Sequence, residues 1–468
     1  MSMLLRITEF SPKYTAYKIA LLFAVLFCTT HLQAQTNLWS PVPLGKNQVI
    51  AEQIPDLPNL DKGMLLQLDV ATMQNLAKTA QKEGNNTRNA TTIIDLPLPD
   101  GSFQKFKIWE SSLMEPELAA KFPEIKTYIL MGIDDPFARG RMSVSPDEFG
   151  AFFTSHQFGQ EVYIRKVLKN SATVYLTYWG KDDPSIQQPF NCLWEGSNDQ
   201  SKAAHQKKIL AGPNETGDVL RVFRLAMTIP GKLAEDYGWT TKAQALAAVV
   251  AFLGQLNVVY ERDLSVRFVL PVKEENIIFI NAATDPFTAL GGGEAANENI
   301  EVINQLIGQE GFDVGLIFVT GACCAAAKPV ICSESKAFNF SAFWSLRVTA
   351  HEIGHQFDAN HTWTSCGPDN NGQFGTNEYG SGTTIMSYAN ICGVDNILPV
   401  GDENYFGVYS QIEMTITSTP KLATKHSKRA IIYLLRAFLR MVFIFQLDRK
   451  STRLNSSHST LSRMPSSA

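Results

Sequence analysis

The sequence predicts an α/β domain that is preceded by a β-rich module. Between residues 220 and 356, segments of strand-like composition alternate with segments whose apolar residues have helical spacing. Between residues 35 and 208, short runs of strand-forming residues are separated by turn-forming residues. The chain has 468 residues, of which 45% are hydrophobic and 18% charged, so it can form two or three globular domains.

Residues 1–34 have the pattern of a secretory signal peptide. Lys13 and Lys18 precede the apolar run 19–27, which is too short to span a bilayer comfortably. Leu32-Gln33-Ala34 is a suitable cleavage site, so we expect the exported chain to begin at Gln35. The expected product is a secreted, extracellular protein with no membrane span after signal removal, in a compartment that permits disulfides.

The β-rich module is placed at residues 35–208. The segments 103–109, 162–164 and 174–179 are rich in strand formers, and Pro99-Asp100-Gly101 marks a turn. Residues 197–214 are polar and contain Lys207-Lys208, which predicts an exposed linker and a processing site.

The α/β domain is placed at residues 209–417. Residues 220–227 predict its first strand, and residues 242–260 predict a core helix because their apolar residues recur at helical spacing. The other expected elements are strands at 265–270, 276–280 and 312–319, a helix at 298–307, and a last helix that starts near Ser345.

That last helix carries a His-Glu-x-x-His motif. His351 and His355 are one turn apart on the same helix face, so both imidazoles can bind one metal ion. A turn after the helix would let His361 supply a third nitrogen, while Glu352 lies beside the first ligand. A buried helix with two incidental histidines also gives this motif, but it does not explain the spacing of His361. Three protein ligands and an open position are typical of a catalytic zinc site.

The motif, together with the downstream segment Gly382-Thr383-Thr384-Ile385-Met386-Ser387-Tyr388, resembles the metzincin metallopeptidases. The sequence segments AHEIGHQF, ANHT and SGTTIMSYANICG are similar to those of the reprolysin-like branch of secreted bacterial proteases. This resemblance implies a twisted mixed sheet, a backing helix and a zinc helix. One position departs from the family, because Asp358 stands where a glycine usually ends the helix in a left-handed conformation. Aspartate is among the few other residues that tolerate a positive φ.

The resemblance implies a secreted zinc endopeptidase that hydrolyses protein or peptide substrates. Zn²⁺ held by the three histidines would activate a water, with Glu352 as general base and then general acid. Tyr388 is either an oxyanion donor or a packed aromatic residue, and Met386 would form an apolar floor under the imidazoles. No motif indicates structural Ca²⁺, and the net charge of -4 gives no sign of nucleic-acid binding.

The position of the β-rich module ahead of such a domain suggests a propeptide, which makes the precursor a zymogen and the propeptide a partner. Cys192 would then be a latency thiol that blocks the zinc, or else a buried or disulfide-bonded cysteine. Cys366 follows the zinc motif and Cys392 follows the methionine turn, so we expect these two to form a disulfide.

Two other interpretations of the site stay open at this point. In one, the third ligand is the carboxylate of Glu378, although His361 has the better spacing. In the other, the chain is a non-catalytic secreted zinc-binding or adhesion module with a decayed protease site, which Asp358 supports and the intact Glu352 opposes.

The C-terminal residues have a different character. Residues 418–447 are unassigned and suggest a frame shift, because they are cationic and lack the polar turns of the preceding chain. Residues 448–468 resemble a translated sequencing adapter, so we do not expect them to belong to the native fold. We expect the native protein to continue into other C-terminal modules.

Overall fold

The computed structural model describes residues 38–42, 50, 52–84, 90–187, 219–289, 291–320, 324–363, 378–388, 392–397 and 404–418. The expected signal peptide, the Lys207-Lys208 processing site and the segment after residue 418 lie outside these ranges. The predictions for those segments therefore stay predictions.

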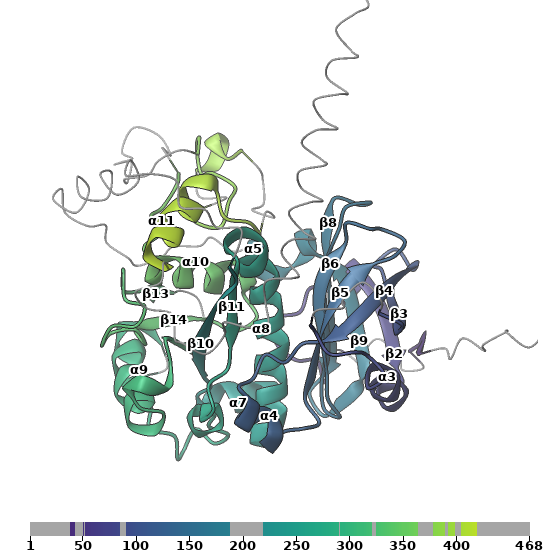
Figure 1. Cartoon of the computed structure of the whole chain (residues 1–468), viewed down its shortest axis with the longest axis horizontal. Coiled ribbons are helices and arrows are strands. Elements are labelled where there is room, and N and C mark those ends of the chain that lie inside the picture. Colours follow the sequence, from purple (N-terminus) through teal and green to yellow (C-terminus); the bar gives the residue numbers. More distant parts are fainter. Residues whose placement is uncertain are drawn as a thin grey trace, which may run out of the picture. The chain divides into compact units, whose positions relative to one another are not determined.

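The N-terminal region is built on a nine-stranded antiparallel sheet with strand order β1-β2-β9-β8-β7-β6-β5-β4-β3 (Figure 1). The strands are β1 (Trp39–Pro41), β2 (Gly63–Leu68), β3 (Ile93–Pro97), β4 (Phe103–Glu110), β5 (Lys126–Gly132), β6 (Arg139–Val144), β7 (Phe149–Ser155), β8 (Gln160–Leu168) and β9 (Ser171–Trp179). The helices are η2 (Leu60–Lys62), α3 (Val70–Ala77), α4 (Pro116–Lys121), η4 (Gly180–Asp182) and α5 (Pro184–Gln187). The predicted β-rich character is confirmed, and the three expected strands fall in β4, β8 and β9.

The second region contains a five-stranded mixed sheet with strand order β11-β10-β12-β14-β13 (Figure 1). Its strands are β10 (Arg221–Thr228), β11 (Val266–Val269), β12 (Val314–Val319), β13 (Ala325–Ala326) and β14 (Asn339–Ala342). Neighbouring strands are parallel except β13, which pairs antiparallel with β14. The helices are α7 (Gly231–Tyr237), α8 (Lys242–Leu264), η5 (Glu274–Ile277), α9 (Gly292–Leu306), η6 (Gln309–Gly311), α10 (Leu346–Gln356), η7 (Gly393–Asp395) and α11 (Val408–Ser418).

One expected strand is wrong. Residues 274–277 form the short helix η5, and Ile278 makes only an isolated bridge with Ile229. Ile277 and Ile278 are both fully buried, so they produce the apolar run that a buried strand also has. The carboxylate of Glu274 accepts the Met227 N–H at 2.9 Å, which ties η5 to strand β10.

The long helix α8 confirms the predicted core helix. It begins with a capping box in which the side chains of Thr241 and Gln244 each accept a backbone N–H, and it ends at Ser265, whose φ is 52°. α8 contacts β6 and β7 of the nine-stranded sheet as well as β11, α10 and α11. By length and composition it could span a membrane, but 83% of its most apolar window is buried inside the protein. It is therefore a core helix with both faces covered.

Four charged residues join the two regions beside the end of α8. Arg141 of β6 donates to Glu261 of α8 at 2.6 Å, and Arg267 of β11 donates to the same carboxylate at 2.7 Å. Arg267 also reaches Glu83 of the N-terminal region through two hydrogen bonds of 2.8 and 3.0 Å. Positive and negative side chains thus alternate in space. Each charge has an opposite charge as its neighbour, which offsets the free-energy cost of partial burial.

Candidate metal centre

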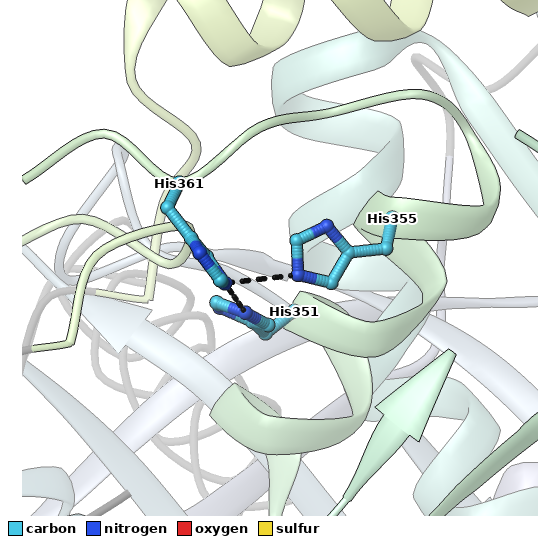
Figure 2. A group of neighbouring side chains, drawn as sticks. All are labelled: His351, His355 and His361. Carbon is cyan, nitrogen blue, oxygen red and sulfur yellow. Dashed lines mark hydrogen bonds between the residues drawn. The ribbon is translucent and has the colours of Figure 1, made fainter. Parts of the chain in front are cut away.

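Three histidine side chains converge at the C-terminal end of α10 (Figure 2). The Nε2 atom of His361 lies 3.1 Å from Nε2 of His355 and 3.2 Å from Nε2 of His351. Tetrahedral ligands at the usual zinc–nitrogen distance of about 2.05 Å lie about 3.3 Å apart. All three side chains are fully buried, and the expected grouping of His351, His355 and His361 is present.

His351 and His355 of α10 are also in the neutral state that metal binding requires. Nδ1 of His351 donates to the carbonyl of Ile385, and Nδ1 of His355 donates to the carbonyl of Ala359, each at 2.8 Å. Burial, with the neighbouring histidines, holds both pKa values well below 6.5. The hydrogen of each neutral ring is therefore on Nδ1, and each Nε2 lone pair points toward His361. Convergent lone pairs on buried nitrogens form a site for a cation.

A tight turn brings His361 back to the helix. The Ala359 N–H donates to the carbonyl of Gly354 at 2.9 Å, and the Asp358 N–H donates to the carbonyl of His355 at 2.8 Å. Asp358 has a φ of 80°, the positive range that glycine usually occupies at this point of the motif. Replacement of the usual glycine by aspartate thus leaves the turn in place.

The methionine segment, residues 382–388, lies beside α10 and the turn that follows it. The Met386 carbonyl accepts the Thr362 N–H at 3.2 Å, next to the third ligand. A Cβ at Gly354 would come within 2.6 Å of Met386 Sδ, so only glycine leaves room for this sulfur beside α10. Arg347 of α10 donates to the carbonyls of Thr383 and Thr384 at 3.0 and 2.5 Å. The helix and the segment therefore form one packed unit.

Glu378 is not part of the histidine group. Its Oε2 accepts the backbone N–H groups of Thr383 and Thr384 at 2.7 and 3.0 Å, and its Oε1 accepts the Thr384 hydroxyl. Both oxygens thus hold the methionine segment, and the alternative with Glu378 as third ligand finds no support in this geometry.

Glu352 is next to the ligand His351 in the sequence, and Tyr388 lies beside the ligand His361 in space. Glu352 is fully buried on α10, directly after His351. The Tyr388 ring is 7% exposed, and its centroid lies 4.5 Å from that of His361 in an edge-on arrangement. Tyr388 also packs against Trp363, with centroids 5.4 Å apart. Its position is compatible with either expected role.

Several supporting side chains were not found from the sequence. Gln356, the last residue of α10, donates to the carbonyls of Gly315 and Lys336 at 3.1 and 3.0 Å. Its Oε1 accepts from Asn339 of β14 at 2.8 Å, and Tyr260 of α8 donates to the Ala350 carbonyl at 2.9 Å. These bonds fix the helix against the sheet and against α8. A glutamine directly after the second histidine gave no signal of this role.

The cysteine predictions stay predictions. Cys192 and Cys366 lie outside the described residues, whereas Cys392 is described and is 9% exposed. The expected latency thiol is taken up below as a proposal, and the expected pair of Cys366 and Cys392 remains a prediction.

Residues 219–412 match the reprolysin-like model of metallo-peptidase family M12B. A search of curated proteins found no match. Among solved structures, the crystal structure of metalloproteinase-II from Bacteroides fragilis is 10% identical, with a TM-score of 0.39 over 73% of this chain and 97% of that chain. A structure of a chaperone–substrate complex is 14% identical, with a TM-score of 0.25 over 42% of this chain and 35% of that chain.

Proposed function

We propose that the chain is a secreted zinc endopeptidase acting on proteins, on the premise that residues 219–412 match the reprolysin-like model of metallo-peptidase family M12B. The observation that carries the proposal is the convergence of three buried imidazole nitrogens, with the two helix Nε2 atoms 3.1 and 3.2 Å from that of His361. Three protein ligands that leave a fourth position open are typical of catalytic zinc, and three histidines are one such set.

His351, His355 and His361 would hold the ion through Nε2, and the carbonyls of Ile385 and Ala359 keep two of these rings in the required orientation. A bound zinc ion supplies Lewis acidity that lowers the pKa of the attacking water and polarises the scissile carbonyl.

Glu352 is the general base in this proposal. Its carboxylate takes the proton of the attacking water and later returns it to the leaving amine, so the residue ends the cycle unchanged. Tyr388, beside His361, would donate a hydrogen bond from its hydroxyl group to the developing oxyanion. The place of Glu352 on α10, directly after the ligand His351, supports this role.

The N-terminal region is proposed to be a propeptide that is cut near Lys207-Lys208 and that keeps the precursor latent. Two observations support this proposal. The region is a separate β-rich sheet ahead of the matched domain. Its last described helix, α5, contacts α10, which carries two of the histidines. The proposed latency thiol Cys192 follows α5 by five residues in the sequence.

The test compares Glu352→Gln and His361→Ala with the wild-type chain after processing. Cleavage of casein and bound zinc are measured for each protein, with and without a chelator. We expect the wild type to cleave casein only without the chelator. Glu352→Gln should keep the zinc but lose cleavage by about 10²–10⁴-fold, because the ligands stay and the proton acceptor is gone. His361→Ala should lose both.

A second outcome would favour the alternative of a non-catalytic zinc-binding or adhesion module. In that case the wild type binds zinc through the histidines but cleaves no protein under any condition. The feature that suggested this alternative was Asp358, and its φ of 80° is the conformation that the motif requires. The protease is therefore the better supported function.

A further inference from the structure

A carboxylate from the last described helix holds the turn that carries His361. Glu413 of α11 accepts the backbone N–H of Asn360 at 2.8 Å through Oε2 and the side-chain Nδ2 of Asn360 at 2.7 Å through Oε1. Glu413 is only 3% exposed. One buried carboxylate thus fixes both donors of the residue that directly precedes the third histidine.

The charge of this carboxylate is compensated locally. Lys328 donates to Oδ1 of Asn360, and its ammonium group lies 3.9 Å from Oδ1 of Asp358. Burial lowers the pKa of Lys328 to about 8, while Glu413 and Asp358 favour its charged form. A lone buried charge would be costly, whereas paired charges are tolerated. Lys328, Asp358, Asn360 and Glu413, named the turn cluster below, therefore form a compensated group.

Asn360 is flanked by two groups that set the geometry of the histidines. The carbonyl of Ala359 accepts from His355 Nδ1 at 2.8 Å, and the next residue is His361 itself. A shift of Asn360 would therefore change the orientation of His355 and the position of His361 together.

We propose that Glu413 is a positioning residue that holds His355 and His361 in metal-binding geometry by fixing Asn360. This inference rests on the proposed zinc site and extends it to a residue 53 positions beyond Asn360 in the chain. Residues that orient metal ligands change metal affinity by about 10–100-fold when they are replaced. The C-terminal helix α11 is then part of the metal centre and not only of the core.

The test is zinc affinity, measured on the full chain by competition with a chelating indicator. Glu413→Gln keeps the shape of the side chain but replaces one acceptor oxygen by an NH₂ group, which faces a donor of Asn360. We expect zinc affinity to fall about 10–100-fold. The double variant N360D/E413Q exchanges donor and acceptor, because the new carboxylate can accept from the new amide and from Lys328. It should regain most of the affinity, which a general loss of packing would not permit.

Glu274→Gln is the matched control. Glu274 is also a fully buried carboxylate that accepts a backbone N–H, in this case that of Met227 in strand β10. Its replacement should leave zinc affinity unchanged, because Glu274 ties η5 to β10 and does not contact the turn that carries His361. Excess zinc should restore casein cleavage by Glu413→Gln but not by Glu352→Gln.

The outcomes separate the inference from the function on which it rests. If His361→Ala binds zinc as tightly as the wild type, the zinc site itself is wrong. If His361→Ala loses zinc but Glu413→Gln binds it within twofold of the wild type, only the role of Glu413 is refuted. Should Glu413→Gln fail to fold, Asn360→Ala removes the side-chain half of the same contact. Unchanged zinc affinity in that variant would equally overturn the inference.

Discussion

Replacement of Gly354 by alanine should damage the metal centre although it improves the helix. Alanine is better than glycine inside a helix by about 1 kcal/mol. At this position, however, the new Cβ would lie 2.6 Å from Met386 Sδ and 3.3 Å from a ring carbon of Phe406. Carbon atoms in van der Waals contact lie about 3.5–4.0 Å apart, so the sulfur must move by about 1 Å.

Met386 has little room for such a movement, because it is fully buried. Overpacking of this kind costs about 1–3 kcal/mol, so the net change in the free energy of unfolding should be a loss of about 0–2 kcal/mol. The main-chain neighbours of Met386 would move with it. The Ile385 carbonyl orients His351, and the Met386 carbonyl holds Thr362 beside His361. Zinc affinity should therefore fall as well.

Gly254→Ala provides the matched control. Gly254 is also inside a helix, but its Cβ would meet only Arg141 Cβ at 3.6 Å and Leu113 Cδ1 at 4.0 Å, which are ordinary contacts. Urea unfolding of the metal-free protein should show a gain of about 1 kcal/mol for Gly254→Ala. The reasoning is refuted if Gly354→Ala is stabilised by as much as Gly254→Ala and binds zinc like the wild type.

Three other changes test separate parts of the structure. Arg267 holds the pKa of Glu83 below 4.5 against the effect of burial, so Glu83 stabilises the fold above that pH and loses this effect as the pH falls. Glu83→Gln should cost about 2 kcal/mol in urea unfolding at pH 7, and the deficit should shrink below about pH 4.5. Tyr388→Phe should lower kcat about 100-fold at unchanged zinc content, whereas an unchanged kcat would leave Tyr388 a packing residue. Cys192→Ser should make the uncleaved precursor active, and a fully latent precursor would exclude the thiol switch.

The parts of the site that could be predicted are those whose chemistry is local in sequence. His351 and His355 are one helical turn apart, and His361 is reached by a single turn, so spacing alone placed all three at one point. The conformation of Asp358 could also be anticipated, because few residues with a side chain accept a positive φ. In each case the constraint comes from covalent geometry over fewer than about a dozen residues.

The supporting residues could not be predicted because their partners are distant in the chain. Glu413 bonds Asn360 across 53 positions, and Gln356 bonds Gly315 across 41. A buried glutamate or glutamine in a helix has no local pattern that names its partner. The wrong strand at 276–280 has a similar origin, since an apolar run predicts burial but does not distinguish a strand from a short helix. The tie between Glu274 and Met227, which holds η5 against β10, is again a contact between residues distant in the chain.

The apolar composition of helix α8 is also explained by contacts between residues that are distant in the chain. A helix packed on one side has an apolar stripe and a polar face, whereas a helix that is apolar all round is enclosed by protein or by lipid. In α8 the second face is covered by the N-terminal region: Ala251 lies next to Gly150 of β7, and Gly254 lies next to Arg141 of β6. A Cβ at Gly150 would come within 3.1 Å of Ala251 Cβ, so glycine at this position lets the sheet approach α8 closely. Glu261, at the end of the same face, meets Arg141. The composition of α8 is therefore matched to the N-terminal sheet as closely as to the metallopeptidase domain in which the helix lies.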